Sequence, residues 1–70
     1  MEYGKYCDIA DDFQHGKNFK CGSFVKIDKD VIVGDDVTIE NFVLLKPGTR
    51  IGNNVFVDSY FRSSGSNKIG

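Results

Sequence analysis

Little in this sequence suggests a metal site, a membrane segment or a secretory leader. The two cysteines, Cys7 and Cys21, do not form a metal-type pair and no second pair could complete a zinc site, so we interpret both as buried thiols. No apolar stretch approaches the length of a membrane span, and residues 1–5 do not begin a basic segment followed by an apolar run. These absences predict a cytoplasmic protein without a metal.

The net charge is also close to zero, because nine basic residues stand against ten acidic ones. The chain therefore lacks an overall field that would draw it onto nucleic acid or an anionic membrane. Its 70 residues describe one domain, 1–70, and a chain of this length buries only about 60% of its unfolded surface. Because ordering the chain nearly cancels that gain, we expect oligomerisation to supply the remaining stability.

What the sequence does contain is a six-residue period along nearly its whole length. With Tyr3 as the first position, Gly4 is second, Tyr6 fourth, Cys7 fifth and Asp8 sixth. The first and fifth positions provide 23 residues, of which 19 are apolar, whereas the overall apolar content of 40% would give about nine. The second position holds six of the eight glycines, and the next two hold mostly Asp, Asn, Lys, Ser, Pro or Gly.

Each repeat thus combines a strand of apolar, variable and apolar residues with a corner of turn-forming residues. In Val37-Thr38-Ile39 the first and third side chains point to one face and the second to the other. A helix is excluded because six is not a multiple of 3.6 and no spacing of three to four persists. Three such units close a coil of 18 residues, so we expect an all-β parallel β-helix of about 3.5–4 triangular coils.

The segments "IVGDDVTI", "LLKPGTRIG" and "IGNNVFV" resemble the hexapeptide repeats of bacterial sugar and sugar-nucleotide acyltransferases. The resemblance covers residues 3–70 and implies a left-handed β-helix and a homotrimer. It does not imply one reaction, because members of the family acylate different substrates, act as carbonic anhydrases or have no activity.

Large apolar side chains recur every 18 residues at the fourth position and should lie above one another along one corner: Tyr6, Phe24, Phe42 and Tyr60. Leu44 and Phe56 point outward from the strands on either side of that corner. A soluble monomer rarely exposes such a patch, so we expect these six residues to form the interface of a homotrimer. The alternatives are that N-terminal residues or local folding cover the patch, or that it binds a different protein.

Basic side chains predominate at the outward strand positions, and Lys26 and Arg62 share the face of Leu44. In a trimer they would line the cleft between subunits, where Arg can bind phosphate through paired hydrogen bonds and a ring can stack. The candidate ligand-binding residues for a small anion such as a nucleotide are Lys26, Arg50, Phe56, Tyr60 and Arg62. The alternative is that these charges only protect exposed sheets and favour solubility.

His15, the single histidine, is the one candidate catalytic residue. The acyltransferases that the repeat resembles use a histidine as general base at the subunit cleft. Here His15 falls at an inward first position, which favours a capping or partly buried residue over a base. We expect no cofactor, and acetyl-coenzyme A only if the chain is an acyltransferase.

Three functions fit these observations. We favour a non-catalytic trimeric binding or scaffold protein over an acyltransferase, or the leading segment of one, and over a purely architectural oligomer or fibre module. Near the end, Ser63 and Asn67 interrupt the inward apolar positions, which indicates either a closing coil or the first part of a longer helix. In both cases strand edges are exposed, so trimers could stack end to end into hexamers or filaments.

Overall fold

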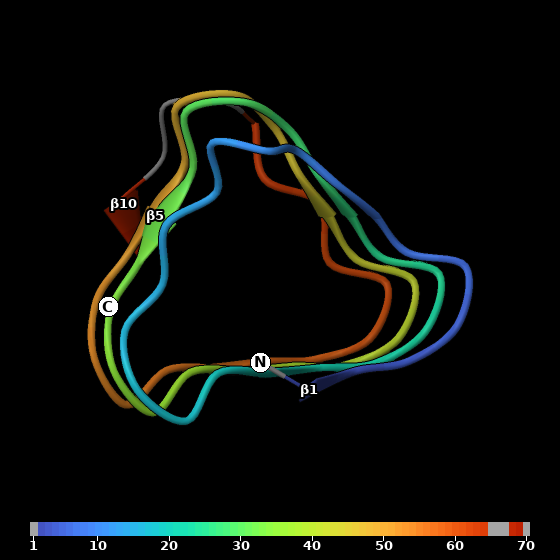
Figure 1. Ribbon diagram of the computed structural model, residues 1–70, viewed down its shortest axis with the longest axis horizontal. Coiled ribbons are helices and arrows are strands. Elements are labelled where there is room, and N and C mark those ends of the chain that lie inside the picture. The colour runs from blue at the N-terminus through green and yellow to red at the C-terminus, as the bar shows by residue number, and fades with distance from the viewer. Residues whose placement is uncertain (1, 65–67, 70) are drawn as a thin grey trace.

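The computed structural model describes residues 2–64 and 68–69, and over these residues the chain is an all-β parallel solenoid of about three turns without a helix. The chain trace winds repeatedly around one interior (Figure 1). Ten strands of two residues each follow one another: β1 (Glu2–Tyr3), β2 (Asp8–Ile9), β3 (Lys20–Cys21), β4 (Lys26–Ile27), β5 (Ile32–Val33), β6 (Thr38–Ile39), β7 (Leu44–Leu45), β8 (Arg50–Ile51), β9 (Phe56–Val57) and β10 (Lys68–Ile69).

The strands form three parallel sheets, in the orders β1-β3-β6-β9, β2-β4-β7 and β10-β8-β5. Each residue pairs with a residue 18 positions away, so Thr38 lies between Lys20 and Phe56. An isolated bridge joins Gln14 to Ile32, and another joins Leu44 to Arg62. This register confirms the expectation that residues 18 apart lie beside one another in neighbouring turns.

In β2 to β10 an outward residue precedes an inward one, and the inward residues form one apolar core. The buried apolar residues are Phe19, Cys21, Val25, Ile27, Val31, Val33, Val37, Ile39, Val43, Leu45, Ile51 and Val57. Tyr3 departs from this pattern, because 57% of its surface is exposed although it occupies an inward position of the repeat. The reason is that β1 is the outermost strand of its sheet, so a neighbouring turn covers it on one side only.

Thr49 and Ser63 place two hydroxyl groups in this apolar core, and both residues are fully buried. The Thr49 hydroxyl donates to Lys46 O over 2.7 Å, and Ser63 Oγ lies 2.8 Å from Thr49 Oγ1 and accepts from Lys46 N. Because the Thr49 proton is already donated, the Ser63 hydroxyl donates to Thr49. The interruption of the apolar positions at Ser63 is thus a satisfied polar pair, whereas Asn67 lies outside the described residues.

The bends between strands, which we call corners, have a residue of positive φ at each described fourth position of the repeat, except at Asp12 in the first turn. Every described residue with a positive φ occupies that position: Tyr6, Asn18, Phe24, Asp30, Asp36, Phe42, Gly48, Asn54 and Tyr60. Their amide groups help to hold the corners in register, since Phe24 N donates to Lys5 O over 2.9 Å and Phe42 N donates to Ser23 O over 3.0 Å.

Glycines at the second position serve a purpose that the sequence did not reveal. They do not supply left-handed backbone, because among the described glycines only Gly48, at a fourth position, has a positive φ. A Cβ atom added at Gly34 would lie 2.1 Å from Asn53 Oδ1 and 3.0 Å from the backbone of Gly52. Asn53 Oδ1 accepts a hydrogen bond from Asp35 N over 2.7 Å. Glycine is needed here because a side chain of the next turn occupies the space.

Candidate association surface and anion-binding residues

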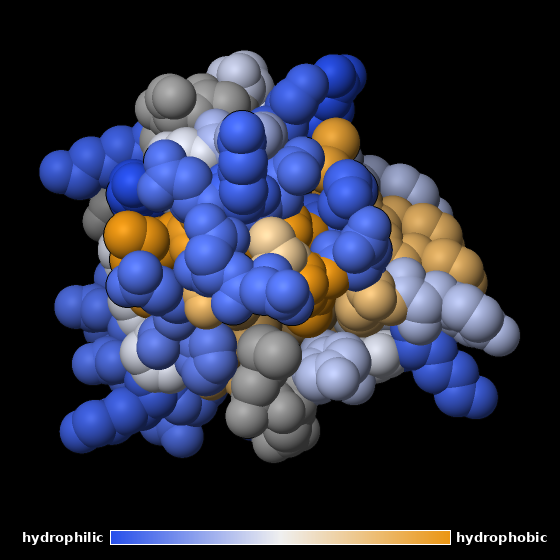
Figure 2. Space-filling view, turned by 45° about the horizontal axis from the view of Figure 1, so that its top comes forward, coloured by the Kyte–Doolittle hydropathy of each residue, from blue (hydrophilic) through white to orange (hydrophobic). Residues whose placement is uncertain are grey.

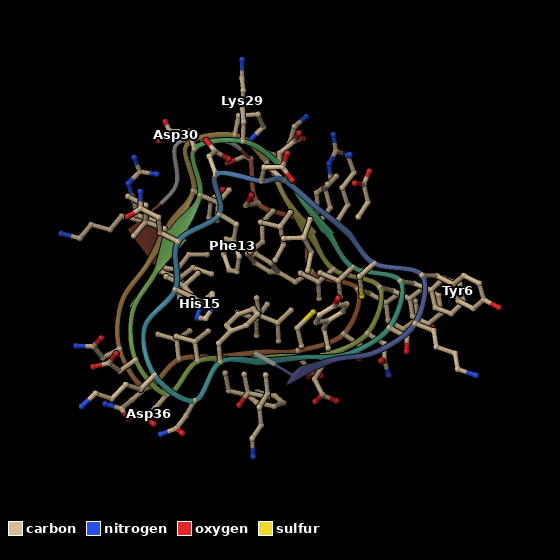
Figure 3. All side chains as sticks on the ribbon, in the orientation of Figure 1. Tyr6, Phe13, His15, Lys29, Asp30 and Asp36 are labelled. Carbon is tan, nitrogen blue, oxygen red and sulfur yellow. The ribbon has the colours of Figure 1, made fainter. Side chains whose placement is uncertain are left out.

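The four aromatic side chains at one corner form a continuous stack, which we call the aromatic ladder: Tyr6, Phe24, Phe42 and Tyr60. Successive ring centroids are 5.0, 5.0 and 5.1 Å apart, and the last two pairs of rings are parallel to within 1°. Tyr6 points away from the interior at this corner, which lies between the first and second sheets (Figure 3). The ladder confirms that residues one turn apart stack directly.

Behind the rings, polar side chains fix the corner from turn to turn. Lys5 N donates to Ser23 Oγ over 3.1 Å, and Ser23 N donates to Asn41 Oδ1 over 2.8 Å. Each of these side chains precedes an aromatic residue of the ladder by one position. The rings are therefore mounted on a hydrogen-bonded corner, and their spacing follows from the spacing of the turns.

The aromatic ladder is largely open to solvent. Tyr6 and Tyr60 are 76% and 78% exposed, and the two phenylalanines between them are about half exposed. Phe56, the outward residue of β9, adds a ring that is 62% exposed, and the partly buried Leu44 of β7 lies on the other side of the corner. Apolar surface gathers accordingly at the right-hand edge of Figure 2. The six residues predicted for an interface thus border one edge of the solenoid.

Backbone conformation makes this corner unusual. The ladder residues have φ values between 58° and 65°, a region in which a bulky side chain is costly. At the two other corners the fourth position carries residues that tolerate this region: Asn18, Asp30, Asp36, Gly48 and Asn54. Sequence reasoning missed this contrast, although the frequent Asp, Asn and Gly at the fourth position were its signal.

The predicted cations beside the ladder do not converge on one point within a single chain. Three outward-facing residues occupy the same place in successive turns of the second sheet: Lys26, Leu44 and Arg62. Leu44 therefore lies between the two cations. Lys26 Nζ lies 2.9 Å from Asp8 Oδ2, and the hydrogen bond and charge of Asp8 raise the pKa of this exposed lysine. Lys26 is thus directed toward the first turn, away from Arg62.

Arg50 belongs to a different surface, the sheet of β5, β8 and β10. Its guanidinium donates to Asp30 Oδ1 over 2.9 Å and also to the Asp30 carbonyl. A shallow depression of about 340 Å³ instead adjoins Arg62, and its lining is Lys46, Arg62, Ser63 and Ser64. Lys46 was not among the predicted ligand residues. It was missed because it occupies a second position, where half of the residues are glycine.

His15 lies at the open side of the first turn. Figure 3 shows it pointing into the interior together with Phe13. Its ring lies 5.5 Å from that of Phe13 and 5.3 Å from that of the buried Phe19, and its Nδ1 is 2.8 Å from Gly16 O. The inward direction agrees with the repeat, but the residue is exposed because no other described turn covers this side. This is an arrangement typical of a packed histidine at the end of a core.

Within the described part of the chain, no group of three or more His, Cys, Asp or Glu residues could hold a metal ion. The same residues contain no helix of the length and apolarity that crossing a membrane requires. Models of protein families gave no match to the chain, and neither did curated proteins or solved structures. The resemblance to hexapeptide-repeat acyltransferases therefore rests on the repeat alone.

Proposed function

We propose that this chain is a non-catalytic oligomerisation and binding module, built as a left-handed triangular β-helix whose copies associate as a homotrimer through the aromatic ladder. The observation that carries the proposal is four exposed aromatic side chains on left-handed backbone. The handedness, the triangular coil and the number of subunits come from the resemblance of the repeat. Three sheets separated by corners whose residues of positive φ recur at multiples of six support the triangular coil.

Energetics favour a role for the ladder beyond the single chain. A left-handed conformation costs roughly 1–2 kcal/mol for a residue with a side chain, and stacking returns about 0.5–1.5 kcal/mol per ring pair. Asparagine would fit the backbone at the same corner at lower cost, as Asn18 and Asn54 do at another. The exposed rings thus add little to the stability of an isolated chain, which points to contact with something else.

A second copy of the same chain is the partner that this surface fits best. The ladder is a ridge with an apolar residue on each flank, Phe56 before it and Leu44 after it. In a ring of three subunits each ridge faces the common axis, and both flanks become covered by neighbours. Burial of this kind supplies the stability that a 70-residue domain lacks on its own.

The ligand that we propose for the clefts between subunits is a small molecule that bears a phosphate group. Arg62 and Lys46 border one depression, and Tyr60 and Phe56 lie at or before the neighbouring corner. In a ring of parallel subunits, the cation-bearing flank of one copy faces the ring-bearing flank of the next. Arg62 would then bind phosphate and a ring would stack on an attached base. End-to-end stacking of such rings stays a prediction, as does a cytoplasmic location.

The first experiment measures molar mass by light scattering for the wild-type chain and for Phe42→Glu. We expect a trimer for the wild type and a monomer or aggregate for the variant, because the substitution buries a charge in the ladder. Ile32→Glu is the matched control, since Ile32 points outward from β5 in a different sheet. If Phe42→Glu is still a trimer, the aromatic ladder is not the interface. If the wild type is a monomer, the chain is not an oligomerisation module.

The second experiment is a thermal-shift screen with nucleotides and acetyl-coenzyme A. We expect a nucleotide to raise the melting temperature, and Arg62→Ala but not His15→Ala to abolish the effect. Stabilisation by acetyl-coenzyme A, together with a turnover that His15→Ala abolishes, would favour the acyltransferase. No response to any of these molecules would leave a purely architectural oligomer.

A further inference from the structure

We propose that Cys7 and Cys21 form a redox pair whose disulfide ties the first turn of the solenoid to the second. The two sulfur atoms lie against one acceptor, since Cys7 Sγ is 3.2 Å and Cys21 Sγ is 3.5 Å from Gly22 O. Both cysteines are free thiols in this structure. The proposal does not depend on trimer formation or on a ligand.

The chain reaches this arrangement from two neighbouring turns. Cys21 ends β3, and its partner in β1 is Tyr3, the last residue before the corner that leads to Cys7. Cys7 points inward from the far side of that corner, so the side chains meet at the base of the aromatic corner. Other repeats carry valine or isoleucine at the equivalent positions, as Val25 and Ile39 do, so the repeat itself does not require a thiol at either one.

The thiols differ in accessibility, which sets the order in which they would react. Cys7 is partly exposed at the open side of the first turn, whereas Cys21 is buried. Burial in the first place, together with the charge and hydrogen bond of Cys7, raises the pKa of Cys21 to about 12. Cys7 is therefore the thiol that an external oxidant meets first, and Cys21 is the resolving thiol.

The proposed oxidant is a small disulfide such as glutathione disulfide. The Cys7 thiolate attacks one of its sulfur atoms, which breaks that S–S bond and releases one glutathione thiolate. Cys21 then loses its proton to solvent and attacks Cys7 Sγ, which forms the intramolecular bond and releases the second glutathione. Two protein thiols are oxidised and one glutathione disulfide is reduced to two thiols, whose thiolates take up from solvent the two protons that the protein released.

The disulfide would stabilise the first turn of the solenoid, which has neighbouring strands on one side only. β1 pairs only with β3 and β2 only with β4, and Tyr3 is more than half exposed. A covalent link between positions 7 and 21 removes conformations from the unfolded chain and prevents the first turn from separating alone. We expect the melting temperature of the oxidised protein to rise by at least about 5 °C.

The test equilibrates the full chain with glutathione buffers of increasing oxidised fraction until its composition no longer changes. Intact mass after alkylation then counts the free thiols. The expected product is a chain lighter by two hydrogens that takes up no alkylating reagent, with a raised melting temperature that a strong reductant reverses. Cys7→Ser and Cys21→Ala are the matched controls, because each retains one thiol and cannot form the intramolecular disulfide.

Three outcomes would overturn the proposal. The wild type could keep both thiols under the most oxidising buffer, or stop at a glutathione adduct on Cys7. It could also form disulfide-linked dimers, which a non-reducing gel separates from the intramolecular product. Each of these results would mean that the sulfur atoms cannot reach bonding distance within one chain.

Discussion

Phe42 and Tyr60 stack with ring centroids 5.1 Å apart and planes within 1° of parallel, although both residues have left-handed backbone, with φ values of 58° and 65°. At the two other corners the described residues with this backbone conformation are Asn, Asp or Gly. Aromatic residues are unfavourable at this backbone conformation, but the register of the solenoid places them above one another. The result is a continuous aromatic surface. This surface is the basis of the proposed association.

Phe42→Asn separates the two roles of the ladder. We expect the variant to lose self-association while the free energy of unfolding of the separated chain changes by less than about 1 kcal/mol, because relief of backbone strain offsets two lost ring contacts. Phe42→Ala removes the same ring but keeps a poorly tolerated residue in the corner. It should therefore be less stable than Phe42→Asn by about 1 kcal/mol. Denaturant unfolding at protein concentrations below the dissociation constant of the oligomer measures the stability of each variant. Equal stabilities of Phe42→Asn and Phe42→Ala would contradict the strain argument.

Gly34 and Gly48 should respond differently to substitution, because glycine is present for different reasons. Gly34→Ala places a Cβ atom against Asn53 and the backbone of Gly52, and overpacking of this kind costs about 1–3 kcal/mol. Gly48→Asn keeps a residue that tolerates the positive φ of 83° and should be nearly neutral. Urea unfolding of the two variants compares them, and a neutral Gly34→Ala would show that the next turn can move aside.

The buried pair of Thr49 and Ser63 should act as one unit. Ser63→Ala leaves Lys46 N without its acceptor, and Thr49→Val removes the donor to Lys46 O and the acceptor for Ser63. We expect each change to cost about 1–3 kcal/mol, with a coupling energy of at least 0.5 kcal/mol in the double mutant. Additive effects would indicate that the hydroxyl groups do not depend on each other.

Alkaline pH should destabilise the reduced protein through Cys21. Its pKa is raised from 9.0 to about 12, chiefly by burial, so the unfolded chain releases the thiol proton at a lower pH than the folded chain does. The unfolding free energy contributed by this group is therefore complete below pH 9 and falls by up to about 1.4 kcal/mol per pH unit above it. Comparing wild type with Cys21→Ala between pH 8 and 11 isolates the thiol, and parallel curves would show that it titrates normally.

Several features of the fold were predictable because the solenoid repeats its geometry every few residues. Apolar residues at the first and fifth positions identified Ile27, Leu45 and Val43 as core residues, and all three are buried. The same count placed Tyr6, Phe24, Phe42 and Tyr60 in one stack, as observed. A period of six is visible in a single chain without knowledge of any long-range contact.

Other features depended on contacts between turns, which the order of residues does not reveal. The exposure of Tyr3 and His15 follows from their place in an outer turn, whereas the repeat alone treats all turns as equal. Lys26 forms an ion pair with Asp8, and Arg50 forms one with Asp30. Long side chains can reach several charged neighbours, so the partner depends on distances that the sequence does not show. The ion pair with Asp8 directs Lys26 away from Arg62, while Arg50 lies on a different sheet.

The sequence by itself determined the parallel solenoid, its inward and outward residues and the row of aromatic side chains, because each depends only on spacing along the chain. The tertiary structure alone decided why glycine stands at Gly34, how Thr49 and Ser63 satisfy each other, and that Cys7 meets Cys21. These depend on close approaches of a few ångströms between neighbouring turns, where the exact path of the backbone decides which atoms come together.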